Sequence, residues 1–342
     1  MAGELGVGLI GYGVMGRTHA AAYAEAARQG LACRVRSIFT QADPSGEATG
    51  NLDAMVSGGG ETDAPITDDI DALLADDRID VVSVCTPTDT HVGIALAALA
   101  EGKHVLVEKP VALEAADIER LAAAAAAAGL HCMPGLCMRF WPAWVWLHDR
   151  VRDGSLGAVR SAAFVRVGNP PAWSSAFYRD LDRSGGALHD LHVHDVDFLH
   201  WCFGVPQAVS SSGDTTHVSS LYHFADGPAP VSAEGGWVDA EGFGFRMRYH
   251  VQFEAAWAEF DLGASPELRL TRGNETTAID ADRGSAYEAE VRHFLRVVRG
   301  DEAPRVTLDD AAVAARIIAA EARSAAAGGA RTAVPRGTGL EP

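Results

Sequence analysis

Three short stretches of this 342-residue chain carry residue types that could serve one active site. Residues Gly11–Gly16 have the spacing Gly-x-Gly-x-x-Gly, which suits close approach to a dinucleotide pyrophosphate. Glu108–Pro110 presents a lysine directly after an apolar run, and Asp190–His194 sets a carboxylate four residues before an imidazole. Together they predict hydride transfer between a nicotinamide cofactor and a hydroxyl group, although each stretch alone is weak support.

The glycine motif gains its value from what surrounds it. The apolar run Leu5–Ile10 precedes it, and helix-forming residues follow from Met15. Gly11 permits a tight turn, Gly13 has no Cβ to obstruct a pyrophosphate, and Gly16 allows close helix–strand packing. The helix N-terminus then faces the negative charge. The alternative is an ordinary strand–helix turn, but the β–α alternation that follows favours dinucleotide binding.

The choice between NAD and NADP depends on the end of the second predicted strand. A site for NAD normally places Asp or Glu there to accept from the ribose 2′-hydroxyl. Here the aligned residue is Thr40, which carries no charge. Asp43 reaches the ribose only if the loop folds back, and Arg17 could approach a 2′-phosphate. Both cofactors stay open, and the net charge of −18 favours NAD.

Two further strand ends are expected to border the cofactor, because ligands of parallel sheets bind beyond the carboxyl ends of the strands. Thr86 and Pro87 follow the run Val81–Cys85, and Lys109 follows His104–Val107. Lys109 would donate a hydrogen bond to the substrate oxygen, and Pro110 could hold the turn in a cis geometry. The residues predicted to contact the cofactor are Gly11, Gly13, Val14, Met15, Gly16, Thr40, Thr86, Pro87, His91, Glu108 and Lys109.

Asp190 and His194 are predicted on one helix, over Leu188–Phe203, at positions i and i+4 of the same face. A carboxylate beside an imidazole fixes its tautomer and raises its basicity, as a general base for an alcohol requires. Asp197 falls near that face as a supporting partner. A metal site is disfavoured, because His189, His192 and His194 diverge at about 100° per residue.

Composition restricts the class of protein. Hydrophobic residues make up 48% and charged residues 22%, as in soluble globular proteins, and no apolar run approaches the ~20 residues of a membrane span. The net charge of −18 repels nucleic acids and anionic membranes. The five cysteines are odd in number and form no CxxC pair, which indicates reduced thiols in a cytoplasm. Neither nucleic acid nor membrane is therefore an expected partner.

The elements that would position these residues fall into two domains, 1–135 and 136–342. In the first, buried apolar runs alternate with helix formers, which predicts a doubly wound parallel sheet, the Rossmann arrangement. The predicted strands are Leu5–Ile10, Val35–Phe39, Val81–Cys85, His104–Val107 and Leu130–Pro134, and the helices are Met15–Gln29, Ile70–Ala75, His91–Ala100 and Glu114–Ala128.

In the second domain a run of strands is flanked by helices, which predicts an α+β domain with a large, mainly antiparallel open sheet. The predicted strands are Ala208–Ser212, Ser219–Phe224, Val231–Val238, Phe245–Phe253, Ala256–Leu262 and Glu267–Leu270. The predicted helices are Ala143–Arg152, Leu188–Phe203, Tyr287–Arg299 and Leu308–Ala326.

The order of these motifs resembles the glucose–fructose oxidoreductase/inositol dehydrogenase (Gfo/Idh/MocA) family over nearly the whole chain. Further matches are Arg139-Phe140-x-Pro142 and Tyr287-x-x-Glu290. The resemblance implies Lys109, Asp190 and His194 as the catalytic set, with Arg139 and Tyr287 near the substrate. It also implies a sugar, cyclitol or related polyol as substrate and a homo-oligomer, dimer or tetramer. Thr40 departs from the pattern and leaves the choice of NAD open.

Two other functions stay open. One is a catalytically silent, dinucleotide-binding regulatory protein, which would be expected to lose the lysine or the histidine; this chain retains both. The other is an enzyme with a tightly held cofactor that runs internal redox cycling. Stoichiometric reduced nicotinamide in the purified protein would favour that second alternative.

Overall fold

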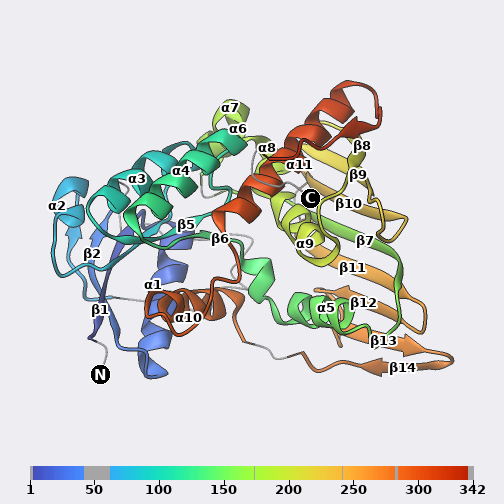
Figure 1. Ribbon diagram of the computed structural model, residues 1–342, viewed down its shortest axis with the longest axis horizontal. Helices are drawn as coiled ribbons and strands as arrows, with labels where there is room; N and C mark the ends of the chain where they lie inside the picture. Colours follow the sequence, from blue (N-terminus) through green and yellow to red (C-terminus); the bar gives the residue numbers. More distant parts are fainter. Residues whose placement is uncertain (1–2, 42–61, 173, 241, 282–283, 338–342) are drawn as a thin grey trace. The chain divides into compact units, whose positions relative to one another are not determined.

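The computed structural model describes residues 3–41, 62–172, 174–240, 242–281 and 284–337 (Figure 1). The chain divides into two compact units. The first consists of Met1–Phe140, Pro171–Phe177 and Gly284–Ala312, and the second of Trp141–Pro170, Tyr178–Arg283 and Val313–Pro342. The first unit therefore includes a late helical segment that sequence analysis assigned to the second domain.

The first unit is built on a six-stranded sheet in the order β3-β2-β1-β4-β5-β6, with every pair parallel. In Figure 1, α1 and α10 lie on one face of this sheet and α3 and α4 on the other. The predicted doubly wound parallel sheet is confirmed. Its strands are β1 (Leu5–Ile10), β2 (Cys33–Phe39), β3 (Ile66–Thr67), β4 (Val81–Val84), β5 (His104–Glu108) and β6 (Cys132–Gly135), and its helices are α1 (Val14–Arg28), α2 (Ile70–Leu74), α3 (Thr88–Ala100), α4 (Ala115–Ala128), the short 3-10 helix Cys137–Phe140 and α10 (Ala286–Val298).

The central strands of this sheet are apolar because helices cover both faces. Val82 in β4 and Leu106 in β5 are completely buried, as are their apolar neighbours on the same strands. Several boundaries in this unit differ from prediction; among them, β5 extends one residue further, to Glu108, and α3 begins three residues earlier, at Thr88 with Pro87 as its N-cap. The first of these shifts brings Glu108, a predicted cofactor contact, into regular structure.

The second unit contains a nine-stranded sheet in the order β14-β13-β12-β11-β7-β10-β9-β8-β15. Only the β7–β10 pair is parallel among the described pairs of this sheet, so the mainly antiparallel prediction is confirmed. Sequence analysis gave no bounds for β7, β14 and β15. The strands are β7 (Val159–Gly168), β8 (Ala208–Gly213), β9 (His217–His223), β10 (Val231–Trp237), β11 (Phe245–Phe253), β12 (Trp257–Asp261), β13 (Leu268–Arg272), β14 (Glu275–Ala278) and β15 (Thr332–Ala333).

One face of this larger sheet is packed and the other is exposed, as the strict alternation of buried and exposed residues along β11 indicates. Trp144 is fully buried and makes edge-to-face contacts with Phe198, Tyr249 and Phe260. The helices of this unit are α5 (Pro142–Asp153), α7 (Leu181–Ser184), α8 (Gly186–Asp190) and α9 (Val193–Phe203), while α6 (Ser175–Arg179) and α11 (Leu308–Ala326) have residues in both units.

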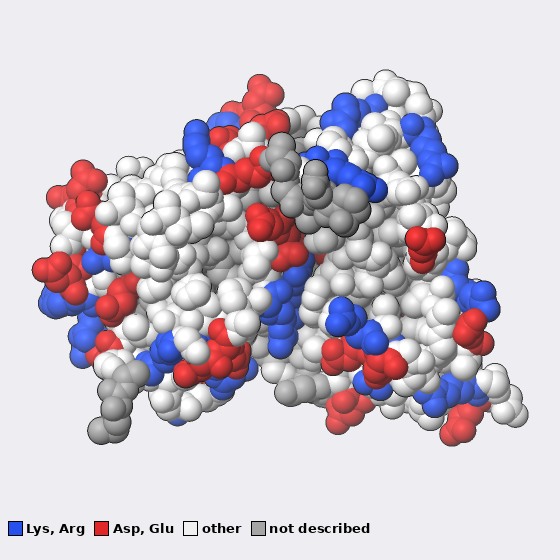
Figure 2. Space-filling model, viewed as in Figure 1, with Lys and Arg blue, Asp and Glu red and all other residues white. Residues whose placement is uncertain are grey.

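Acidic and basic side chains are interspersed on the face drawn in Figure 2. None of the described helices combines the length and the apolar character needed to cross a membrane. All five cysteines are free thiols.

Candidate active site

The glycine loop joins β1 to α1 and has the geometry that a pyrophosphate requires. Gly11 has φ +95°, and a Cβ there would lie 2.6 Å from the carbonyl oxygen of Cys85. A Cβ on Gly16 would lie 2.0 Å from the carbonyl oxygen of Gly11. Gly13, the N-cap of α1, would present its Cβ to open space, with no atom within 4 Å. The loop thus leaves room for a ligand directly at the start of the helix.

The first turn of α1, from Val14 and Met15, contains no acidic residue, and its N-cap makes no side-chain hydrogen bond. Because the N-terminus of a helix carries partial positive charge, this end suits a diphosphate. Gly11, Gly13 and Gly16 therefore fit a dinucleotide in the way that the spacing predicts.

Thr40 directly follows β2 and is buried, with 9% of its surface exposed. Asp43 lies outside the described residues. The guanidinium of Arg17 stacks on the ring of Tyr12, with Cζ 4.8 Å from the ring centroid. The described residues at this position thus include no carboxylate that would select NAD.

The ends of β4 and β5 are neighbours, with Val84 paired to Val107. His91 on α3 bridges the loops that follow: its Nε2 lies 2.7 Å from the carbonyl oxygen of Thr86 and its Nδ1 2.9 Å from that of Pro110. The Lys109–Pro110 peptide is cis, as the sequence suggested. The two predicted strand-end loops are therefore held together by one buried imidazole.

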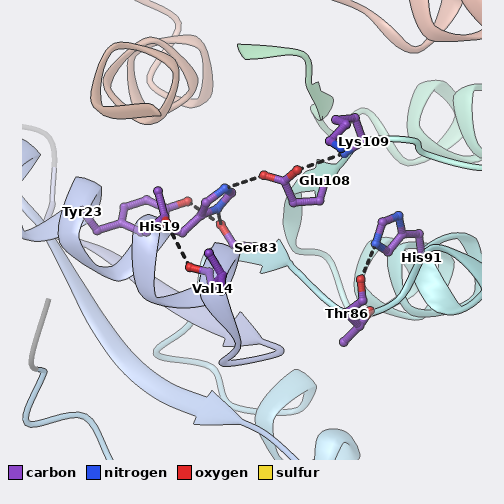
Figure 3. Close-up of polar contacts among 9 residues, drawn as sticks. Val14, His19, Tyr23, Ser83, Thr86, His91, Glu108 and Lys109 are labelled. Carbon is purple, nitrogen blue, oxygen red and sulfur yellow. Dashed lines mark hydrogen bonds and ion pairs between the residues drawn. The ribbon is translucent and has the colours of Figure 1, made fainter. Parts of the chain in front are cut away.

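Glu108, a predicted cofactor contact, belongs to a buried polar cluster whose other members, His19, Ser83 and Tyr23, sequence analysis did not include in the site (Figure 3). His19 on α1 is fully buried, with Nε2 2.9 Å from Glu108 Oε1 and Nδ1 3.2 Å from Ser83 Oγ. Tyr23 extends the cluster through a 2.9 Å hydrogen bond to Ser83. The sequence contained one signal, the position of His19 three residues beyond the glycine motif.

The electrostatics of this cluster favour a charged pair. Burial by itself would lower the pKa of His19, but the neighbouring Cys85 and Glu108 outweigh it and raise the pKa well above 6.5. Burial would likewise raise the pKa of Glu108, but its hydrogen bond and attraction to His19 bring the net pKa below 4.5. An imidazolium and a carboxylate thus neutralise each other inside the unit.

Two predicted substrate residues have different surroundings. Tyr287 on α10 is buried, which raises the pKa of its hydroxyl, and Cys137 and Glu108 add to the rise. Arg139 is 2% exposed, donates to the carbonyl oxygen of Arg305 at 3.1 Å and pairs with Asp310 at 3.2 Å. The guanidinium of Arg139 is therefore held by partners within the first unit, and its predicted place near the substrate stays a prediction.

The second unit contains Asp190 and His194, and here the one-helix prediction is wrong. The helix breaks at Leu191 and His192: Asp190 is the last residue of α8, and His194 is the second residue of α9. Asp190 and His194 therefore do not share one face of a continuous helix. Asp197 is fully buried on α9.

Two buried ionic contacts surround the break. His192 Nε2 lies 3.2 Å from Glu321 Oε1, which also accepts from the hydroxyl of Tyr222 at 2.6 Å. The guanidinium of Arg166 binds both carboxylate oxygens of Asp195, at 2.8 and 2.9 Å. The contact with Glu321 raises the pKa of His192 against the lowering effect of burial. Among the described residues, no group of three or more His, Cys, Asp and Glu side chains is placed to hold a metal ion.

Comparison with known proteins places these features in a family. Residues 5–136 match the oxidoreductase family with an NAD-binding Rossmann fold, and residues 144–258 match the GFO/IDH/MocA C-terminal domain. An uncharacterized oxidoreductase of Synechocystis sp. is 31% identical over 42% of this chain, an alignment that spans only 39% of that relative's length.

Two longer matches cover most of the chain. The scyllo-inositol 2-dehydrogenase (NAD(+)) of Bacillus subtilis is 27% identical over 70% of this chain and 74% of its own length. The crystal structure of GenD2 from gentamicin A biosynthesis, in complex with NAD, superposes with a TM-score of 0.80 at 25% identity, over 98% of both chains.

Proposed function

The chain belongs to the Gfo/Idh/MocA family of oxidoreductases, and on that basis we propose that it transfers hydride between NAD(P) and a secondary hydroxyl of a sugar, cyclitol or related polyol. The observation that carries the proposal is the glycine loop, whose open N-cap at Gly13 lies at the same sheet edge as the strand end that presents Lys109. This is the edge at which parallel sheets bind their ligands.

Gly11, Gly13 and Gly16, with the first turn of α1, would hold the dinucleotide. When bound, the nicotinamide ring supplies the hydride acceptor for oxidation and the hydride donor for reduction. Lys109 donates a hydrogen bond to the substrate oxygen and stabilises negative charge on it as the proton leaves.

His194 is the proposed general base that takes the hydroxyl proton, and Asp190 is its proposed carboxylate partner. In reduction His194 returns that proton. Tyr287 is the proposed additional substrate contact, supported by its electrostatic coupling to Glu108, the residue before Lys109.

The substrate class rests on the relatives, which include a protein named scyllo-inositol 2-dehydrogenase. The names of the relatives include both NAD(+) and NADP(+), so the preference for NAD that we propose rests on the strongly acidic chain. The uncharged Thr40 supports neither. We further propose a cytoplasmic homo-oligomer, dimer or tetramer, on the basis of the free thiols and the family resemblance.

The test follows reduced-nicotinamide absorbance with NAD and NADP against inositols, aldoses and sugar acids. The chain contains only two lysines, both flanking β5, which provides a matched control. Lys109→Ala should reduce steady-state turnover by at least about 100-fold, which leaves a residual rate that single-turnover measurements detect. Lys103→Met should preserve turnover. This change removes the other ammonium, which lies directly before β5 and donates to the carbonyl oxygen of Asp76. Turnover that survives Lys109→Ala would contradict the role of the lysine, and cofactor binding without any turnover would favour a regulatory protein.

A further inference from the structure

The starting observation is that Glu108 uses both carboxylate oxygens inside the first unit. Oε1 lies 2.9 Å from His19 Nε2, and Oε2 accepts the backbone N–H of Lys109 at 3.2 Å (Figure 3). A buried carboxylate is stable only when it is paired and hydrogen-bonded. The Lys109 amide is thus one of the two groups that fix Glu108, and His19 is the other.

The other side of the same turn is held by His91. This imidazole is 1% exposed, and its ring nitrogens lie 2.9 Å from the Pro110 carbonyl oxygen and 2.7 Å from the Thr86 carbonyl oxygen. A neutral imidazole has one N–H and donates to one of the two carbonyls, whereas an imidazolium donates to both. Burial lowers the pKa of His91, although the two carbonyls oppose the effect.

The two histidines come from elements that flank the proposed cofactor site. His19 lies in the second turn of α1, the helix that the glycine loop opens. His91 lies in the first turn of α3 and is bonded to the loop after β4. Each therefore links a proposed cofactor-binding element to one side of the Glu108–Pro110 turn.

We propose that His19 and His91 are positioning residues for Lys109: His19 acts through the Glu108 carboxylate on the lysine's amide, and His91 acts through the carbonyl of Pro110. The inference rests on the proposed catalytic role of Lys109. Because the backbone is held immediately before and after the lysine, its Cα is placed relative to α1 and the β4 loop, and the direction of its side chain follows. A displacement of about 1 Å in such a group can reduce turnover by about 100-fold.

A purely structural histidine would lower the rate by the same factor whether or not Lys109 is present. The first experiment is therefore a double-mutant cycle of His19→Ala and Lys109→Ala measured as kcat. We expect His19→Ala to lower kcat by about 10- to 100-fold in the native background, with KM for the nucleotide within about threefold. In the Lys109→Ala background, followed by single turnover at high enzyme concentration, the same change should lower the rate by less than about threefold, because the group it positions is gone. His104→Gln, at the opposite end of β5, is the control and should leave kcat unchanged.

A second pair of variants keeps the test informative if His19→Ala does not fold. The amide nitrogen of Asn can replace Nδ1 of His91, which faces Pro110, and that of Gln can replace Nε2, which faces Thr86. We expect His91→Asn to retain several-fold more kcat than His91→Gln, since only the contact with Pro110 touches the lysine turn. His19→Gln, which keeps a donor for Glu108, should likewise exceed His19→Ala.

The outcomes separate the two proposals. If Lys109→Ala itself retains native turnover, the catalytic role of the lysine fails. If Lys109→Ala is strongly slowed but the His19 loss has the same factor in both backgrounds, or His91→Gln equals or exceeds His91→Asn, the positioning role is overturned while the lysine's role stands.

Discussion

The glycine loop gives the sharpest prediction, because a Cβ added at Gly13 would meet open space whereas one added at Gly16 would meet the backbone. A methyl group on Gly13, which has φ −79° in extended backbone, meets no atom within 4 Å. Alanine at a helix N-cap is less favourable than glycine by roughly 0.5–1 kcal/mol, and reduced freedom of the unfolded chain restores about 0.4–1 kcal/mol. Gly13→Ala should therefore change the free energy of unfolding by less than about 1 kcal/mol.

The same methyl group would occupy the space through which a pyrophosphate approaches the loop. We expect Gly13→Ala to weaken NAD and NADP binding by at least about 10-fold, or 1.4 kcal/mol. Gly16→Ala should act on stability instead, because its Cβ would lie 2.0 Å from the Gly11 carbonyl oxygen, where real Cβ contacts do not fall below 3.0 Å. The backbone must move, at an expected cost of roughly 1–3 kcal/mol or more.

The assay combines calorimetric titration of both cofactors with urea unfolding. Gly93→Ala is the control, since Gly93 lies inside α3 with open space around it and should gain up to about 1 kcal/mol without affecting binding. Native-like cofactor binding by folded Gly13→Ala would refute the assignment of the loop to the pyrophosphate.

Three further perturbations test other parts of the account. The difference in free energy of unfolding between the native protein and His19→Gln should be largest between pH 4.5 and 6.5. Because the pKa of His19 is raised on folding, the stability from the charged pair is lost as the pH rises above 6.5. Because the pKa of Glu108 is lowered on folding, the same stability is lost as the pH falls below 4.5. Urea unfolding at pH 5.5, 7 and 8.5 checks this, and a pH-independent difference would contradict the charged pair. Thr40→Asp should weaken NADP binding by about 10-fold or more while sparing NAD, as seen by titration, because a carboxylate repels the 2′-phosphate; equal effects on both cofactors would show that residue 40 does not face the ribose. Asp195→Asn should destabilise the second unit by about 3–5 kcal/mol in urea unfolding, since it leaves the buried guanidinium of Arg166 without its bidentate carboxylate; a loss below about 1 kcal/mol, the usual value for an exposed pair, would contradict that reasoning.

The parts of the site that depend on local pattern were predictable. The glycine loop and the ends of β4 and β5 follow from short apolar strands and the residues directly after them, and the parallel sheet brings those ends to one edge. Thr40 was placed correctly at the end of β2 for the same reason.

Contacts between distant residues were not predictable from local pattern. His19 and Glu108 are 89 residues apart, and Arg139 meets the backbone of Arg305 from 166 residues away. Leu188–Phe203 has a helix-forming sequence, yet the chain breaks at His192, whose side chain is buried against Glu321 on α11, 129 residues away. Such tertiary contacts override local helix preference.

Isotope transfer is the most direct test of hydride transfer itself. A polyol that supports turnover would be prepared with deuterium on the carbinol carbon and oxidised with the preferred nucleotide, and the reduced nucleotide would be weighed by mass spectrometry. We predict that the deuterium moves from that carbon to the nicotinamide and that Lys109→Ala forms almost none of the labelled product. Reduced nucleotide that contains solvent hydrogen instead, or substrate consumed without any reduction of the nucleotide, would contradict this prediction.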